Sequence, residues 1–148
     1  MKIALVASGG GHLKEISFIE SFYKKHDHFF VTFERPNSIS LAKKEKVHFV
    51  IDPKRNPIKL IQNIIQSITI FLKEKPDVII STGAGVAIPI CYFGKLFDAK
   101  IIFIESFCRT EEPSLTGKLV YPISDLFIYQ WEKLKEFYPN VIYGGLLI

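Results

Sequence analysis

The chain alternates between short apolar runs rich in β-branched residues and longer segments with helical periodicity. The runs that we predict as strands are KIALVA (2–7), HFFVTF (28–33), VHFVI (47–51), DVIIS (77–81), KIIFIE (100–105), DLFIY (125–129) and NVIYG (140–144). Predicted helices lie near 12–25, 38–45, 57–74, 85–97, 115–122 and 131–137. Near-continuous apolar strands that alternate with helices are typical of parallel sheets covered on both faces. The pattern therefore predicts an α/β fold with a doubly wound, mainly parallel, Rossmann-like sheet.

Composition limits the possible functions. The 148 residues are predicted to form a single domain, 1–148, because no linker, internal repeat or low-complexity tract interrupts them. A formal net charge of +4 suits a phosphate-bearing partner or an anionic membrane surface and is too small to indicate nucleic acid. The two cysteines, Cys91 and Cys108, lack metal-binding spacing, which favours a reducing cytoplasmic setting. We expect neither a bound metal nor a cofactor.

The segment 57–74 is the clearest predicted helix. Pro57 lies near its start, Pro76 follows its end, and its isoleucines and leucines form a broad apolar stripe. The favoured interpretation is a helix whose stripe packs on the sheet; the alternative is that part of the stripe faces lipid or a partner. Polar residues interrupt the segment too often for it to span a membrane. Lys54, Arg55 and Lys59 beside the stripe are compatible with an anionic membrane surface.

Polar and glycine-rich segments follow most of the predicted strands. In a parallel sheet, ligands bind beside the carboxyl ends of the strands. The segments that follow those ends contain Ser8-Gly9-Gly10-Gly11-His12, Glu34-Arg35-Pro36-Asn37, Asp52 with Lys54 and Arg55, Thr82-Gly83-Ala84-Gly85, Glu105 with Ser106 and Arg109, and Gln130-Trp131. We therefore expect a binding site at this edge of the sheet.

The SGGGH and STGAG segments are glycine-rich turns between a strand and a helix. Backbone N–H groups in such turns can approach an anion, and the following helix directs its positive end to the same place. Neither segment is a GxGxxG fingerprint or a P-loop, and either one alone could be a simple tight turn. Two of them on one edge favour binding of a diphosphate or a sugar. The candidate diphosphate-binding residues are Gly9, Gly10, Gly11, Thr82, Gly83, Gly85 and Arg109.

His12 and Glu105 are the candidate catalytic residues. His12 lies at a predicted helix start, where the helix dipole favours the neutral imidazole that acts as a general base near pH 7; a capping or turn histidine is the alternative. Glu105 ends a buried strand, where a charged side chain needs a partner. Arg109 is the expected partner of Glu105 or, alternatively, the clamp for a substrate phosphate.

Several motifs together resemble one protein family along essentially the whole chain. They are SGGGH, STGAG, IESFCR, SLTGKLVYPISDLFIYQW and the terminal YGGL. The family is the acceptor-side, membrane-side subunit of two-chain N-acetylglucosaminyltransferases of dolichol-linked oligosaccharide synthesis, with bacterial relatives of the PssD/CpsF type. The glycine–histidine loop is more distantly similar to that of MurG.

The resemblance implies the N-terminal, acceptor-side half of a GT-B glycosyltransferase. Such a chain would bind a polyprenyl-diphosphate-linked sugar as a peripheral protein on the cytoplasmic face of the cell membrane. A separate donor-binding partner would hold the UDP-sugar, so this chain would be inactive alone. That the sequence stops at YGGLLI, just after the last predicted strand, fits this expectation. Residues expected at the partner interface or the site edge are Glu34, Arg35, Gln130, Trp131, Gly144 and Gly145.

Two other functions remain open at this point. The glycine-rich first turn is compatible with a self-contained nucleotide-binding Rossmann module without transferase activity, in which Glu34 would have to serve as the ribose ligand. The third possibility is a scaffold that only recruits a catalytic partner to the membrane.

Overall fold

The sheet is parallel throughout, as the alternation of strands and helices predicts. In the computed structural model, which describes residues 1–147, the strand order is β3-β2-β1-β4-β5-β6-β7. The strands are β1 (Lys2–Ala7), β2 (Asp27–Thr32), β3 (Val47–Phe49), β4 (Val78–Gly83), β5 (Lys100–Ile104), β6 (Leu126–Tyr129) and β7 (Ile142–Tyr143). The chain runs from β1 to one edge, returns to β4 and continues to the other edge. The strand order therefore reverses between β1 and β4, which is where ligands bind in folds of this type.

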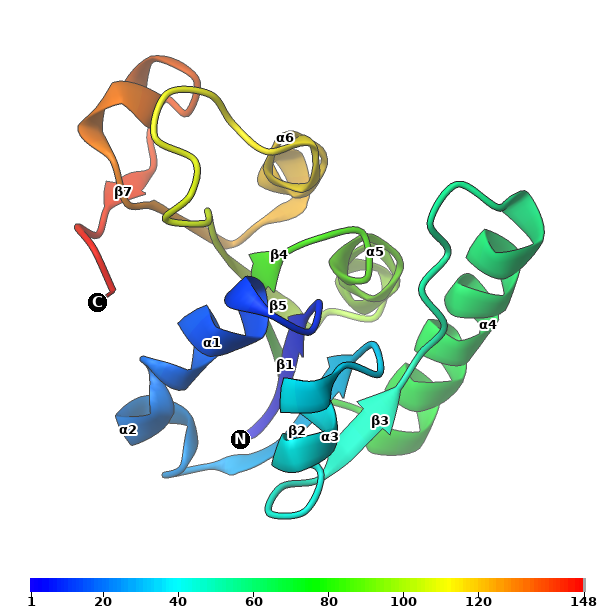
Figure 1. Ribbon diagram of the computed structural model, residues 1–148. Helices are drawn as coiled ribbons and strands as arrows, with labels where there is room; N and C mark the ends of the chain where they lie inside the picture. Colours follow the sequence, from blue (N-terminus) through cyan, green and yellow to red (C-terminus); the bar gives the residue numbers. More distant parts are fainter. Residues whose placement is uncertain (148) are drawn as a thin grey trace.

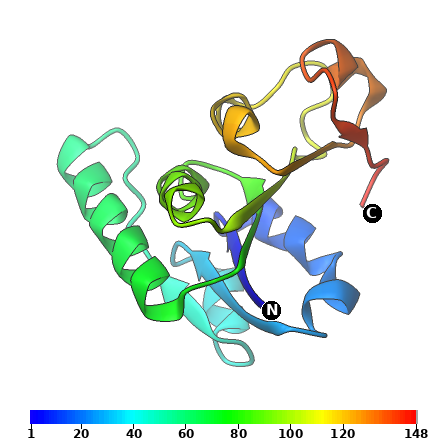
Figure 2. The same cartoon turned by 180° about the vertical axis from the view of Figure 1, so that it is seen from behind.

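Helices cover both faces of the sheet (Figures 1 and 2). One face carries α1 (Gly11–Ser17), α2 (Glu20–Tyr23) and α3 (Pro36–Leu41), and the other carries α4 (Pro57–Glu74), α5 (Ala87–Leu96) and α6 (Leu115–Val120). Short 3-10 helices, η1 (Tyr121–Ile123) and η2 (Glu132–Glu136), flank β6. Successive side chains of β1 point to opposite faces of the sheet and so belong to two cores. Ile3 and Leu5 pack under α1, whereas Ala4 and Val6 face α4 and α5. The predicted doubly wound α/β class is confirmed.

Four predicted elements differ locally from the structure. The helix predicted near 131–137 is the 3-10 helix η2, and the strand predicted at 140–144 is reduced to the two residues of β7. The predicted helix 12–25 is broken after Ser17, where the N–H groups of Phe18 and Ile19 bond to carbonyls three residues back and the Ser17 hydroxyl donates to the Lys14 carbonyl. Such bonds tighten the turn and compete with the helical ladder. The strand predicted over 47–51 ends at Phe49 because side chains of α4 bind the backbone of Ile51.

The orientation of α4 contradicts the favoured interpretation of its apolar stripe. The residues buried against the domain are Asn63, Ser67, Ile70, Phe71 and Glu74, three of which are polar. The exposed apolar residues are Ile58, Leu60, Ile61, Ile64, Ile65 and Leu72. Polar contacts of the inner face set this rotation, since the Asn63 amide donates to the Ile51 carbonyl at 2.8 Å and buried Glu74 pairs with Lys2, Lys46 and His48. Over residues 1–147, no helix is long and apolar enough to cross a membrane.

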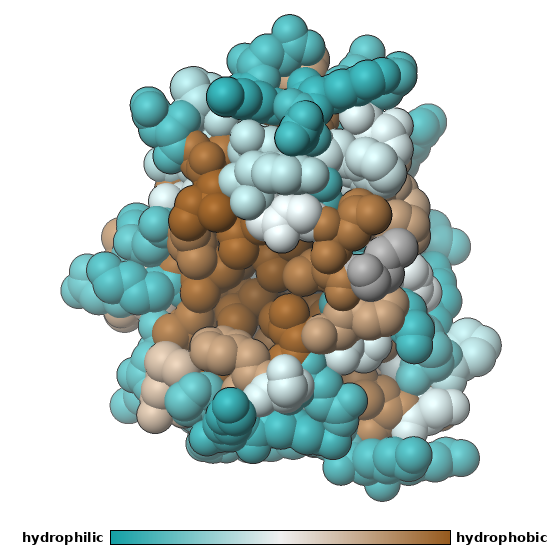
Figure 3. Space-filling view, turned by 90° about the vertical axis from the view of Figure 1, so that its left-hand side faces the viewer, coloured by the Kyte–Doolittle hydropathy of each residue, from teal (hydrophilic) through white to brown (hydrophobic). Residues whose placement is uncertain are grey.

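The sheet face that carries α1 is left partly bare over β5, β6 and β7. Register pairs Ile102 with Leu126 and Ile128 with Ile142, so these four side chains share that face. None of the four is fully buried, and Ile142 is 55% exposed. Figure 3 looks onto this side of the molecule and shows a hollow with hydrophobic side chains at its centre.

Candidate functional site

One pocket joins four strand ends at the carboxyl edge of the sheet. Its volume is about 360 Å³. It is lined by Ser8, Gly9, Phe33, Arg35, Asp52, Pro53, Lys54, Ala84 and Gly85. These residues follow β1, β2, β3 and β4, so the structure brings together the first half of the predicted edge. His12 lies outside the lining, in the first turn of α1.

Gly9 and Arg35 form one wall of this pocket. A Cβ atom on Gly9 would lie 2.6 Å from Cγ of Arg35, so the missing side chain lets Arg35 lie across the loop. Nη2 of Arg35 is 3.2 Å from Oδ2 of Asp52, and both side chains are partly exposed. A guanidinium carries five N–H donors, which leaves donors for a bound anion. Lys54 adds a second cation to the pocket wall.

Asn37 holds the glycine loop from the second strand end. Its Oδ1 accepts from the Gly10 N–H at 3.1 Å, and its Nδ2 donates to the Gly10 carbonyl at 3.1 Å. The Gly83 N–H likewise donates to the Ser81 hydroxyl at 3.1 Å. In this conformation neither N–H is free for the diphosphate that we predicted it to bind. Asn37 was visible in the sequence after the second strand, but only the fold shows that it clamps the first loop.

His12 is fixed against the end of β4. Its Nδ1 lies 2.9 Å from the Thr82 carbonyl oxygen, and the Thr82 hydroxyl donates to the His12 carbonyl at 2.7 Å. A carbonyl only accepts, so the proton of the neutral ring is assigned to Nδ1, and Nε2 keeps the lone pair. The ring packs on Gly83, where a Cβ atom would lie 3.1 Å from Cε1. His12 thus presents a partly exposed imidazole that can accept a proton at Nε2.

Glu15 is a buried carboxylate beside His12 that the sequence analysis did not single out. Its Oε1 accepts from the Phe107 N–H at 2.7 Å and from the Ser106 hydroxyl at 3.1 Å. Its Oε2 lies 3.7 Å from Nδ1 of His12 and has no hydrogen-bond partner in the described residues. Glu15 thus places a carboxylate oxygen next to the imidazole. The signal in the sequence was an acid between Leu13 and Ile16 on an otherwise apolar face of α1.

Glu105 ties the second half of the edge together. Its side chain is fully buried and accepts from the Ser106 N–H, the Ser114 N–H and, at 2.6 Å, the Tyr138 hydroxyl. Burial, and then the hydrogen bond and charge of Glu105, raise the pKa of Tyr138, so this hydroxyl stays protonated and donates. The predicted pair between Glu105 and Arg109 is wrong: Arg109 is exposed, and its backbone N–H donates to the Ser106 carbonyl. The catalytic role of Glu105 as a base stays a prediction. The complete burial of its side chain does not favour that role.

The residues after β6 and β7 hold the same loops. Gln130, predicted at the partner interface or the site edge, is 1% exposed; it donates to the Glu105 carbonyl and accepts from the Leu147 N–H, both at 3.0 Å. The prediction that it faces a partner is therefore corrected. Trp131 donates from Nε1 to the Phe107 carbonyl at 2.6 Å.

The other predicted edge residues differ in their surroundings. Glu34 is exposed. Gly144 packs under Ile128, and Gly145 has a positive φ of 68°. Neither observation assigns these residues to a partner interface, so that role stays a prediction.

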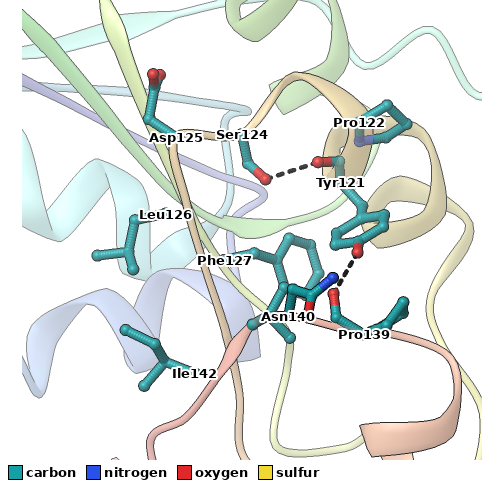
Figure 4. A pocket seen from close by; sticks show the side chains of 10 residues that line it. Tyr121, Pro122, Ser124, Asp125, Leu126, Phe127, Pro139, Asn140 and Ile142 are labelled. Atoms are coloured by element: carbon teal, nitrogen blue, oxygen red, sulfur yellow. Dashed lines mark hydrogen bonds between the residues drawn. The ribbon is translucent and has the colours of Figure 1, made fainter.

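A second pocket lies at the opposite edge, by the amino ends of β6 and β7 (Figure 4). Its volume is about 510 Å³. Hydrogen bonds from Tyr121 to the Pro139 carbonyl and from Ser124 to the Tyr121 carbonyl close its wall. Asp125 is its charged residue, and Lys95 already pairs with it at 2.9 Å. The pocket is remote from the glycine loops. Within residues 1–147, no cluster of three or more metal-ligating side chains occurs.

Comparison with known proteins identifies the family. The model of the Alg14-like oligosaccharide biosynthesis proteins matches residues 52–147, which is more than half of the chain. The chain belongs to the Alg14 family. The UDP-N-acetylglucosamine transferase subunit ALG14 of Mus musculus is 27% identical over 183 residues, covering 100% of this chain and 83% of the mouse protein. The subunit of Candida albicans is 42% identical over 94 residues, covering 60% of this chain and 43% of that protein.

Solved structures agree on the fold. MurG of Acinetobacter baumannii superposes with a TM-score of 0.71 at 12% identity, over 97% of this chain and 43% of MurG. The UDP-GlcNAc 2-epimerase of Methanocaldococcus jannaschii gives a TM-score of 0.74 at 16% identity, over 92% of this chain and 42% of the epimerase. This member of the Alg14 family thus spans under half the length of these structures and has the fold of the N-terminal half of a GT-B glycosyltransferase.

Proposed function

We propose that this chain is one of the two subunits of a bipartite glycosyltransferase, namely the subunit that does not bind the sugar donor. It binds a polyprenyl-diphosphate-linked sugar acceptor at the membrane and recruits the partner chain that holds the UDP-sugar. The reaction serves polysaccharide or glycan biosynthesis. Membership of the Alg14 family is the observation that carries this proposal, because the matched relatives are named as UDP-N-acetylglucosamine transferase subunits.

The pocket at the carboxyl edge supports an anionic acceptor. Arg35 and Lys54 bring two cations to its wall, and the absence of a side chain at Gly9 lets Arg35 lie against the loop. Paired phosphates are well matched by a guanidinium, which can donate two parallel hydrogen bonds. We assign the acceptor diphosphate to this pocket. Gly85, which lines the pocket, and Gly11 and Arg109, which lie outside its lining, remain candidate contacts.

His12 supplies the proposed proton acceptor. Sugar transfer requires removal of a proton from the attacking hydroxyl and stabilisation of the departing UDP. The Nδ1 contact with the Thr82 carbonyl leaves Nε2 free to take that proton, and Glu15 stabilises the imidazolium that results. The partner chain stabilises the UDP. We place the complex on the cytoplasmic face of the membrane.

Reconstitution with a donor-binding partner tests the proposal. The chain is purified alone, the partner alone, and both after co-expression, and transfer from UDP-N-acetylglucosamine to a polyprenyl-diphosphate-linked sugar is measured. We expect transfer only from the two chains together. Transfer by the isolated chain would overturn the split-enzyme assignment. Tight binding of a nucleotide to the isolated chain, measured by calorimetry, would instead favour a self-contained nucleotide-binding module.

A further inference from the structure

The outer face of α4 is apolar and has no cover within the described residues. Ile58 is 69% exposed, and Ile61 and Ile65 are each 58% exposed. The apolar surface continues across the end of α5, where Leu96 is 74% exposed and the ring of Phe97 lies 5.9 Å from that of Phe71 on α4. We call this surface the α4 patch; it comprises Ile58, Leu60, Ile61, Ile64, Ile65, Leu72, Leu96 and Phe97. Exposed apolar surface of this extent marks an interaction site.

The inner contacts of α4 hold this patch outward. Asn63 and Gln66 bond to the backbone of Ile51, and Glu74 accepts from Lys46 and His48 at 2.8 Å each. Turning the isoleucines inward would break these bonds and leave a buried carboxylate without its cations. The apolar face is therefore a fixed feature of the fold.

Basic residues lie at both ends of α4, whereas an exposed acid, Asp98, follows Phe97 at the α5 side of the patch. Lys54, Arg55 and Lys59 lie at the amino end of α4, and Lys73 and Lys75 lie at its carboxyl end. All five are exposed, and none forms an ion pair with another residue of 1–147. The acidic residue of the 54–75 segment, Glu74, faces the sheet. A ligand that matches α4 must be apolar along the middle of the helix and negative near its two ends.

We propose that α4 lies flat on an anionic lipid surface, with its isoleucines below the headgroups and the flanking cations on lipid phosphates. An 18-residue helix is about 27 Å long, which suits a helix lying in the plane of the interface. Lys54 is one of the cations at the amino end of α4 and also lines the pocket at the carboxyl edge of the sheet. In this orientation the pocket therefore opens beside the membrane. This inference deepens the proposed function, because an acceptor with a polyprenyl tail would then reach the pocket without leaving the bilayer.

Vesicle binding by the whole chain tests the inference without acceptor, donor or partner. The probes are vesicles of phosphatidylcholine alone and of phosphatidylcholine with about 30% phosphatidylglycerol, at low and high salt. We expect co-sedimentation with the anionic vesicles, weakened by salt. Two variants should each weaken binding by more than about tenfold. The first combines Ile61→Asp with Ile65→Asp. The second combines Arg55→Glu, Lys59→Glu and Lys73→Glu.

A matched control separates the patch from net charge. The control variant combines Lys43→Glu, Lys44→Glu and Lys135→Glu, and it changes the net charge by the same amount as the triple α4 variant. These three lysines are exposed elsewhere on the surface. The control variant should keep binding within about threefold, because attraction falls off within a Debye length. Equal binding to neutral and anionic vesicles, or insensitivity to both α4 variants, would overturn the proposal. So would a shift from dimer to monomer caused by the α4 variants, which would show that a second copy covers the patch. Because no sugar transfer is measured, failure here leaves the transferase proposal standing.

Discussion

The two halves of the carboxyl edge of the sheet use similar residues in opposite ways. Beyond β5 and β6, loop backbones are held in place by two buried carboxylates, Glu105 at the end of β5 and Glu15 reaching across from α1. Beyond β1 to β4, Arg35, Asp52 and Lys54 remain accessible around a pocket. We call these the closed half and the open half. A charged residue after a strand therefore indicates a ligand site only where the fold leaves it free.

The largest expected effect is on the closed half. Glu105→Ala should lower the free energy of unfolding by about 3 kcal/mol, because it leaves the Tyr138 hydroxyl and the Ser114 N–H buried without an acceptor. Urea denaturation measures the change. Glu112→Ala, an exposed neighbour in the same loop, is the control and should change stability by less than about 0.5 kcal/mol. A negligible loss for Glu105→Ala would end the distinction between the halves.

Substitution of His12 should affect catalytic activity strongly and stability only slightly, in contrast to substitution of Glu105. His12→Ala should lower transfer by the reconstituted two-chain enzyme by about 100-fold or more, as expected for loss of a general base. Its unfolding free energy should fall by less than about 1 kcal/mol, because the ring is partly exposed. Full activity of this variant would remove His12 from the reaction.

Glu74, at the amino ends of the strands, provides a third buried carboxylate for comparison. Burial raises its pKa, but hydrogen bonds from Lys2, Lys46 and His48 outweigh burial and lower it from 4.5 to about 2. A lowered pKa in the folded state means that the charged form adds stability above pH 4.5 and that this stability is lost as the pH falls toward 2. Glu74→Gln should therefore cost roughly 2 kcal/mol at pH 7, since Lys46 is half exposed and screened.

Urea denaturation of both proteins from pH 7 to pH 2.5 checks the Glu74 prediction. The difference between wild type and Glu74→Gln should shrink steadily over the acid part of that range. A difference that stays constant with pH would show that the side-chain amide, rather than the missing charge, causes the loss.

A pair of glycine substitutions gives the smallest and most closely matched contrast. A Cβ atom on Gly117, in the closed half, would overlap the Glu105 carboxylate and lie 2.6 Å from the Tyr138 hydroxyl. Gly117→Ala should cost about 1.5 kcal/mol, because these neighbours are fixed. A Cβ atom on Gly9 would lie 2.7 Å from Cβ of Arg35, which is fixed to the backbone, so Gly9→Ala should cost about 1 kcal/mol. Thermal unfolding compares the two, and a larger loss for Gly9→Ala would show that the open half is the rigid one.

The sheet was predictable from the sequence because its strands are short, apolar and rich in β-branched residues, a pattern that depends on local chain properties. The convergence of polar segments on one edge followed from parallel strand direction alone. The rotation of α4 was not predictable, since it depends on bonds from Glu74 to Lys2 and Lys46, far away in the sequence. The partners of Glu105 were missed for the same reason: Tyr138 lies 33 residues away, whereas Arg109 was close in sequence but not in contact.

The contacts of α4 with Ile51 have a further consequence for how the molecule behaves at high concentration. β3 is an edge strand of only three residues, and an exposed strand edge can recruit strands from other molecules. Gln66 accepts from the N–H of Ile51, and Asn63 donates to its carbonyl, immediately beyond that strand. These two amides occupy the backbone groups of the residue that would otherwise lengthen the edge strand. The polar inner face of α4 thereby keeps the exposed strand edge short, which limits the length over which another strand could pair.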